Sequence, residues 1–195
     1  MTAKSTKGTG YADRLSRLSG VWWKRVFDVQ RPYRWNLRRL KLGKTLDVGC
    51  GIGRNLINLG PTSVGVDHNP HSVAIAKKKG LSAYTSDEFR RAMAGKKSPF
   101  DSMLLAHVLE HMPTADGKKI IQEYLPYVKT NVVVICPQEK GFASDETHVN
   151  FLDHRAIADI LVSCGLKVYR SYSFPFHRIT GKVFTYNETV VVAKK

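Results

Sequence analysis

A glycine-rich turn follows the first short apolar run of the sequence. Gly49, Gly51 and Gly53 stand two residues apart directly after residues 45–48, and Asp47 lies two residues before the first of them. Glycines let a backbone turn tightly and approach a ligand, and a helix that starts there offers unpaired N–H groups. The spacing excludes a P-loop, because no Gly-Lys-Ser/Thr follows, and it differs from the dinucleotide fingerprint Gly-x-Gly-x-x-Gly. The carboxylate of Asp47 argues against a pyrophosphate and favours a ligand with a cationic group.

A second carboxylate stands about twenty residues later, at the end of another apolar run. Asp67 closes the sequence Ser-Val-Gly-Val-Asp. In a parallel sheet, a carboxylate at the tip of the second strand is placed to accept hydrogen bonds from both hydroxyls of a ribose. Asp47 and Asp67 would then lie on either side of one ligand, and the pattern predicts a nucleoside.

Together, the two motifs resemble those of the class I S-adenosylmethionine-dependent methyltransferases, and the resemblance extends over residues 44–195. It implies S-adenosylmethionine as the cofactor. Gly49 and Gly51 then approach its methionine part, Asp47 helps to hold its ammonium group, and Asp67 binds its ribose. A nicotinamide-binding domain with a degenerate turn is the alternative.

Further cofactor contacts follow from the same resemblance. It implies that His68 flanks the adenine and that Asp87 bonds the adenine amine, and a helix N-cap at Ser86 or Asp87 is the alternative. The implied cofactor-binding residues are Asp47, Gly49, Cys50, Gly51, Gly53, Asp67, His68, Asp87 and Ala106.

Three histidines are the candidates for catalysis. His107 and His111 stand four residues apart in a run, residues 100–112, that resembles the family's fourth strand and the turn after it. His148 lies in Thr-His-Val-Asn-Phe, which resembles a Thr-His-Val-x-Phe segment of the family. Because an imidazole takes up a proton near neutral pH, we interpret each as a candidate general base, with substrate orientation as a second role for His107 or His111. A capping or packed histidine is the alternative.

His107 and His111 stand four residues apart, with Glu110 between them. This is the spacing of paired metal ligands on one face of a helix. The sequence is not His-Glu-x-x-His, however, because Val108 occupies the position of the glutamate. We therefore predict no metal site.

From residue 44 onward, short apolar runs alternate with helical stretches, of which the first covers residues 53–59. Such alternation predicts a doubly wound α/β domain whose parallel sheet is covered on both faces. The last two strand-like runs, 166–174 and 183–195, have no helix between them and predict an antiparallel hairpin. We expect a mostly parallel, seven-stranded, Rossmann-like methyltransferase sheet with a helical N-terminal extension. Six aromatic residues near these two runs are expected mostly in the core: Tyr169, Tyr172, Phe174, Phe176, Phe184 and Tyr186.

We divide the chain into a disordered basic tail over residues 1–10, a helical basic extension over 11–40, broken near Pro32, and a methyltransferase domain over 41–195. The first 45 residues hold twelve Lys and Arg against Asp13 and Asp28, within a net charge of +15. Such a segment attracts anions, which could be an anionic membrane surface, nucleic acid or a phosphorylated substrate. A solvated helix without a partner is the alternative.

No apolar stretch approaches the ~20 residues of a membrane span, and the polar N-terminus does not resemble a secretory signal. We therefore expect a cytoplasmic protein, with peripheral contact to the inner membrane face as an option. The cysteines are too few and too widely spaced for a disulfide framework or a Cys-x-x-Cys zinc site, and we expect three reduced thiols: Cys50, Cys136 and Cys164.

The first hypothesis for the methyl acceptor is a small molecule or a cell-envelope lipid or glycolipid. The sequence Phe-Asp, six residues, then Val-Leu-Glu-His resembles the subgroup that methylates small molecules, quinone precursors and lipid-like substrates. The Asn/Asp-Pro-Pro-aromatic sequence of many base N-methyltransferases is absent. An RNA methyltransferase that uses the basic arm is the second hypothesis, and a non-catalytic cofactor-binding regulator is the third. As a whole, the chain resembles uncharacterised actinobacterial methyltransferases.

Overall fold

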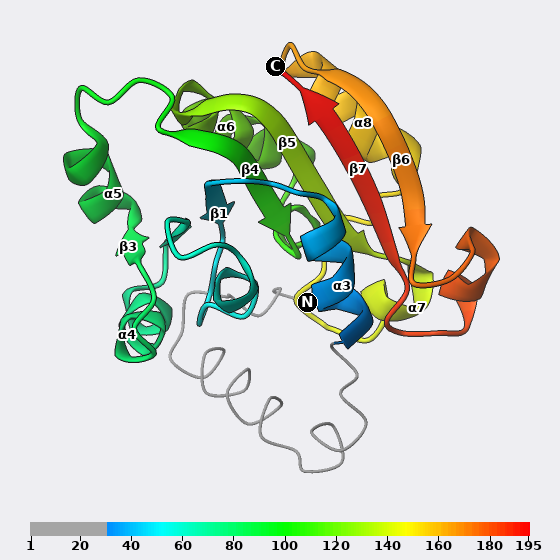
Figure 1. Cartoon of the computed structure of the whole chain (residues 1–195). Helices are drawn as coiled ribbons and strands as arrows, with labels where there is room; N and C mark the ends of the chain where they lie inside the picture. Colours follow the sequence, from blue (N-terminus) through cyan, green and yellow to red (C-terminus); the bar gives the residue numbers. More distant parts are fainter. Residues whose placement is uncertain (1–30) are drawn as a thin grey trace.

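A seven-stranded sheet runs through the centre of the protein (Figure 1). The computed structural model describes residues 31–195 of the 195-residue chain. The strand order is β3-β2-β1-β4-β5-β7-β6, and β7 runs antiparallel to both β5 and β6 while the other neighbours are parallel. The predicted mostly parallel sheet with an antiparallel C-terminal pair is thereby confirmed. The strands are β1 (Thr45–Val48), β2 (Val64–Asp67), β3 (Ala83–Thr85), β4 (Phe100–Ala106), β5 (Val128–Pro137), β6 (Lys167–Phe174) and β7 (Glu188–Lys194).

Helices connect the strands, and side-chain caps fix where several of them begin. The side chain of Asn69 accepts hydrogen bonds from the backbone N–H groups of the next helix, and Thr85 and Glu88 form a reciprocal capping box. Asp153 caps a third helix in the same way as Asn69. The α-helices are α3 (Arg31–Arg39), α4 (Pro70–Lys78), α5 (Ser86–Met93), α6 (Thr114–Tyr124), α7 (Glu139–Phe142) and α8 (His154–Ser163). The short 3-10 helices are η1 (Leu56–Asn58), η2 (Leu109–His111), η3 (Leu125–Tyr127) and η4 (Arg178–Lys182).

The core lies on both faces of the central strands. Successive residues of β4 point to opposite faces, so Met103 packs in one apolar cluster and Leu104 in another. The first cluster includes residues of α5, α6 and α8, whereas Leu37 of α3 packs in the second. Figure 1 shows α6 and α8 behind the sheet and α3 in front of it. Burial on both faces requires the nearly continuous apolar runs of the central strands.

Two predicted elements differ from the structure. The helix expected over residues 53–59 is reduced to η1, because the glycine turn occupies the start of the short connection to β2. The expected hairpin is antiparallel, but residues 175–187 form a long connection containing η4. Phe176, Phe184 and Tyr186 consequently lie outside the strands. Phe176 and Tyr186 are about half exposed, as is Tyr169 within β6, whereas Phe174 is buried as predicted.

The predicted N-terminal extension is described only from residue 31. The tail over residues 1–10 and most of the extension, including Trp22 and Trp23, lie outside the described residues. α3 is described from Arg31, the first described residue, and it includes Pro32. Its Trp35 is half exposed and stacks on Phe174 with ring centroids 5.9 Å apart.

We expect Phe89→Ala to lower the free energy of unfolding by about 3–5 kcal/mol, the range for truncating a buried aromatic residue. Phe89 is fully buried and contacts Phe100, Tyr124 and Tyr127. Urea unfolding measures the change. The control, Phe176→Ala, removes a ring that is 53% exposed and should cost much less. Equal losses in the two variants would contradict this description of the core.

Candidate functional site

Most of the predicted site residues gather at the edge of the sheet where the parallel strands end. Asp47 lies in β1, Asp67 ends β2, and Ala106 ends β4. Because β7 is antiparallel, its first residue, Glu188, pairs with Pro137 at the end of β5 and lies at the same edge. In doubly wound sheets, this edge is where ligands bind.

The glycine turn is fixed by contacts on two sides. The backbone N–H groups of Gly49 and Cys50 both donate to the carbonyl of Val66, at 2.8 and 3.1 Å. Lys79 donates through Nζ to the carbonyl of Ile52 at 2.8 Å. Gly49 has φ of +75°, and a Cβ there would lie 2.5 Å from Val108 Cγ2, so this position accepts only glycine without strain.

The other residues of the turn complete it. Gly51 and Gly53 also have positive φ, +52° and +81°. The side chain of Cys50 is buried in an apolar cluster with Leu56 and Val73, so only its backbone is placed to face a ligand.

Asp67 links the glycine turn to the turn that opens α4. Its Oδ2 accepts from the N–H of Gly51 and its Oδ1 from the N–H of Asn69, both at 2.8 Å. Each oxygen keeps a second lone pair, so the carboxylate can also accept from ribose hydroxyls. His68 is half exposed, with Nδ1 3.6 Å from Asp67 Oδ1.

Asp47 is fully buried, and neither of its carboxylate oxygens has a hydrogen-bond partner among the described residues. Burial and then the charge of Asp67 raise the pKa of Asp47 to about 8, and the nearby amide of Asn55 partly opposes this. A buried carboxylate without a partner is costly. A cationic ligand group would remove that cost, which is the fit expected for the ammonium of S-adenosylmethionine.

The structure places Asp87 in the first turn of α5. Its carboxylate contacts Arg90 at 2.7 Å and is 75% exposed. The N-cap of the helix is Thr85, so the predicted alternative of a cap at Ser86 or Asp87 is wrong. The role of Asp87 toward adenine stays a prediction.

His107 is held between two glutamates. Its Nε2 lies 2.8 Å from Glu188 Oε1 and its Nδ1 3.3 Å from Glu110 Oε1. Its φ of +59° is unusual for a residue with a side chain and turns the chain out of β4. Burial alone lowers the pKa of His107, but Glu110 and Glu188 outweigh it and raise the pKa to about 10. At neutral pH, His107 is therefore a cation with both ring nitrogens engaged.

His111 and His148 meet on the other side of Glu110, with ring centroids 4.7 Å apart. The loop that carries His148 is anchored there because the N–H groups of Val149 and Asn150 donate to the Glu110 carbonyl, at 2.9 and 3.1 Å. Burial lowers the pKa of His111 despite the opposing charge of Glu110. The four-residue spacing thus separates His107 from His111, which contact different parts of the protein.

Two residues of the site were absent from the sequence prediction. Glu188 is an acid at the start of a strand that contains the apolar run 190–193, which was the one available signal. Tyr33 of α3 has a ring centroid 6.4 Å from that of His107, and its hydroxyl is buried without a hydrogen-bond partner among the described residues. Burial and then Glu188 raise the pKa of Tyr33 well above its usual value.

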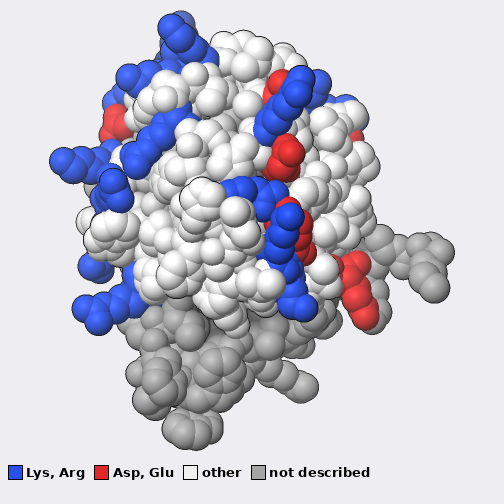
Figure 2. Space-filling model, turned by 90° about the vertical axis from the view of Figure 1, so that its right-hand side faces the viewer, with Lys and Arg blue, Asp and Glu red and all other residues white. Residues whose placement is uncertain are grey.

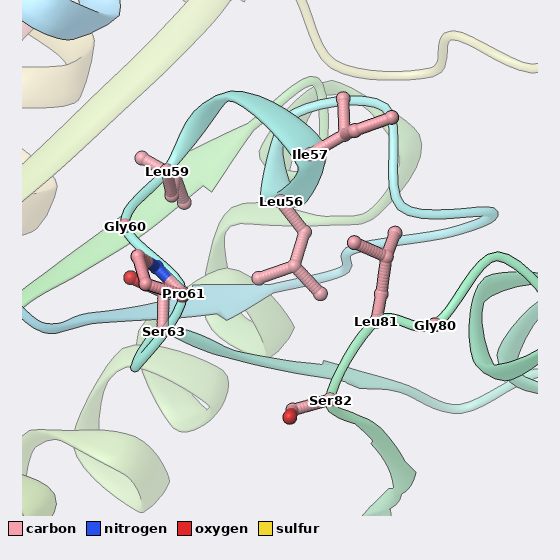
Figure 3. A pocket seen from close by; sticks show the side chains of 9 residues that line it. All are labelled: Leu56, Ile57, Leu59, Gly60, Pro61, Ser63, Gly80, Leu81 and Ser82. Atoms are coloured by element: carbon pink, nitrogen blue, oxygen red, sulfur yellow. The ribbon is translucent and has the colours of Figure 1, made fainter.

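A surface pocket of about 280 Å³ lies elsewhere (Figure 3). Its lining comes from residues 56–63 and from Gly80, Leu81 and Ser82, which precede β3. It is therefore at the amino ends of β2 and β3, opposite the edge with Asp47, and its lining has no titratable side chain. We assign it no part in the chemistry.

Known proteins resemble the chain in sequence. The family model described as "Methyltransferase domain" matches residues 22–171. The "Tabtoxin biosynthesis enzyme" of Pseudomonas amygdali pv. tabaci is 32% identical over 144 residues, which are 67% of this chain and 57% of that protein. The "Ubiquinone biosynthesis O-methyltransferase" of Methylocella silvestris is 30% identical over 91 residues, 43% of this chain and 36% of that protein. The matches thus span little more than half of one curated relative and about a third of the other.

Solved structures share the fold. Magnesium protoporphyrin IX methyltransferase from Synechocystis with bound SAH superposes with a TM-score of 0.67 and 17% identity, covering 97% of this chain and 96% of that one. A SAM-dependent methyltransferase from Archaeoglobus fulgidus has a TM-score of 0.65 and 18% identity, over 89% of this chain and 98% of that one. At such identities the likeness shows the fold alone.

The raised pKa of Asp47 predicts a pH dependence of stability. A carboxyl that binds its proton more tightly in the folded state loses stabilisation as pH rises from about 4 toward about 8. In the cofactor-free protein, we expect Asp47→Asn to lose less stability than the wild type between about pH 5 and about pH 9. Thermal unfolding at both pH values measures this, with Asp116→Asn as control, because Asp116 is an exposed residue of α6. The idea fails if Asp47→Asn follows the wild-type pH dependence.

Proposed function

The chain belongs to the methyltransferase domain family, and from that premise we propose that it transfers the methyl group of S-adenosylmethionine to a small, lipid-like acceptor. S-adenosylmethionine is the methyl donor of this family. The observation that carries the proposal is the buried carboxylate of Asp47, unpartnered among the described residues, beside a glycine turn with positive φ angles.

The residues at the sheet edge fit the parts of this cofactor. Asp47 would hold the ammonium, the backbone of Gly49 and Gly51 would contact the methionine part, and Asp67 would accept from the ribose hydroxyls. When bound, the cofactor supplies a methyl group on a cationic sulfonium, which needs little further activation. The contribution of the protein is then to position the acceptor in line with that methyl group and to exclude water.

The histidines divide between two roles. His107 carries a proton at neutral pH and contacts two glutamates, which suits the orienting role rather than that of a base. The lowered pKa of His111 leaves that ring neutral at pH 7, as a proton acceptor must be. His111, with His148 beside it, is therefore our candidate to accept a proton if the methyl acceptor is a hydroxyl.

Cofactor binding tests the proposal directly. In titration calorimetry, we expect S-adenosylmethionine and S-adenosylhomocysteine to bind, while NADH and ATP do not. Asp67→Ala should weaken binding by about 10–100-fold, because hydrogen bonds to a charged group contribute about 1.5–3 kcal/mol.

The matched control is Asp116→Ala, which removes an exposed carboxylate on α6. Binding of NADH in place of S-adenosylmethionine would reject the proposed cofactor site. Circular dichroism of Asp67→Ala separates a lost contact from a lost fold.

The connection between β6 and β7 supports a lipid-like acceptor. Over residues 175–187 it has no Asp or Glu, and it exposes Ile179 by 68% and Val183 by 76%. Figure 2 shows that side of the molecule as a broad uncharged area bordered by Lys and Arg side chains, with Asp and Glu side chains among them on one side. Apolar side chains among cations suit an anionic lipid surface. Among residues 31–195, no helix is long and apolar enough to cross a membrane.

The names of the curated relatives also concern small molecules, tabtoxin and ubiquinone. They support a small acceptor but do not identify it.

Vesicle binding tests the lipid contact. We expect the wild type to sediment with phosphatidylcholine vesicles that contain phosphatidylglycerol, and Ile179→Asp with Val183→Asp to weaken this by about tenfold or more through lost apolar burial. Val162→Asp is the control, because Val162 is 58% exposed but lies on α8. Unchanged binding of the double variant would remove this surface from the proposal.

A further inference from the structure

Three potential metal ligands converge beside the candidate methyl-transfer site. A carboxylate oxygen of Glu110 and one ring nitrogen each of His111 and His148 lie within 4.8 Å of one another. Glu110 is fully buried, and the two histidines are partly buried. The residues come from η2 and from the loop after α7, so the cluster exists only in the folded chain.

The tautomer of His148 is fixed by its surroundings. Its Nδ1 lies 2.8 Å from the carbonyl oxygen of Phe142, which can only accept a hydrogen bond. Nδ1 therefore carries the proton, and the lone pair is on Nε2. A ligand histidine whose other nitrogen donates to a backbone carbonyl is a common arrangement around metals, because the hydrogen bond orients the ring.

His111 has a matching arrangement. Its Nδ1 lies 3.2 Å from the carbonyl oxygen and 3.0 Å from Oγ1 of Thr147. The Thr147 hydroxyl donates to Asp145 Oδ1 at 2.8 Å, so toward His111 it accepts. Both contacts place the proton of His111 on Nδ1 and the lone pair on Nε2.

Glu110 supplies the negative charge. Neither of its carboxylate oxygens has a hydrogen-bond partner among the described residues, and its ion pair with His107 joins Oε1 to Nδ1 at 3.3 Å. The buried ion pair with His107 marks Glu110 as a carboxylate rather than a carboxylic acid. An ionised carboxylate and two imidazoles are the protonation states that a metal requires.

We propose that Glu110, His111 and His148 bind one divalent first-row transition metal ion, with Zn²⁺ as the reference case. Two imidazole nitrogens and one carboxylate oxygen are a ligand set of zinc and non-haem iron sites, whereas Mg²⁺ prefers oxygen ligands. Tetrahedral Zn²⁺ ligands stand about 3.3–3.5 Å apart, so the three side chains need to close by ~1 Å. The sequence analysis predicted no metal site, and it considered only His107 as a second histidine ligand beside His111. In the structure His107 contacts Glu188, and His148 lies beside His111 instead.

Three protein ligands would leave one coordination position for an acceptor oxygen. In the metal-bound protein the ion would activate that oxygen in place of His111, because it takes up the Nε2 lone pair with which His111 would otherwise accept a proton. A metal at this position lowers the pKa of a bound hydroxyl, so the ion would favour oxygen acceptors that can enter its coordination sphere. Metal binding itself does not depend on methyl transfer and can be measured without an acceptor.

The test is calorimetric titration of the tag-free full chain, stripped with EDTA, with ZnCl₂ and separately with MgCl₂. We expect one Zn²⁺ per chain, a rise in the thermal unfolding midpoint on its addition, and no comparable effect of Mg²⁺. His148→Ala and His111→Ala should each weaken Zn²⁺ binding by at least about 100-fold, more than the usual loss for residues around the ligands. Glu110→Gln should also weaken it.

The matched control is His154→Ala, which removes a partly exposed histidine of α8 that contacts Ser171 and Ser173. It should bind Zn²⁺ as the wild type does. Unfolding midpoints in EDTA identify any variant that has lost its fold. Zn²⁺ binding that is absent, equal in His148→Ala and the wild type, or matched by Mg²⁺ would overturn the proposal, whatever the result for S-adenosylmethionine.

Discussion

An ionised carboxylate inside a protein has to be compensated by a cation or by several hydrogen-bond donors, because removal from water costs several kcal/mol. This constraint governs the carboxyl edge of the sheet, where Asp47, Glu110 and Glu188 are all buried. His107 compensates the two glutamates. Asp47 has no compensating group among the described residues, and its raised pKa of about 8 keeps it protonated at neutral pH until a cation binds beside it. The rest of the fold holds these groups close together. A bound cation would therefore supply the positive charge that the cofactor-free protein lacks beside Asp47.

The strand order is what concentrates the charges. Parallel strands all present their carboxyl ends at one edge, and the antiparallel β7 adds its first residue to the same edge. The short glycine turn brings the N–H of Gly51 against Asp67, and the loop around Asn150 is pinned to the Glu110 carbonyl. Each of these contacts joins segments that are distant in sequence. Together they explain how short turns and loops form one site.

The sequence predicted those parts of the molecule that depend on local pattern. The glycine turn, the end of β2 and the antiparallel pair could each be predicted from a short stretch of sequence. Turn-forming residues and hydrophobic periodicity are local properties that depend on neighbouring residues. Tyr33 and Glu188 could not be found in this way, since only the tertiary fold brings them to His107. The shared face considered for His107 and His111 assumed a helix or a helical turn. The left-handed backbone at His107 instead turns the two rings toward different neighbours.

The position of β7 has a consequence for the order in which the protein can be assembled. Among the described strands, β6 pairs only with β7, so residues 167–174 have none of these strands to pair with until residues 188–194 insert beside β5. During synthesis, Glu188, one of the two acidic partners of His107, therefore joins the site only with β7, which is made long after β4. Until then, an incompletely synthesised chain exposes the edge of β5, an unpaired row of backbone groups that invites association with other chains.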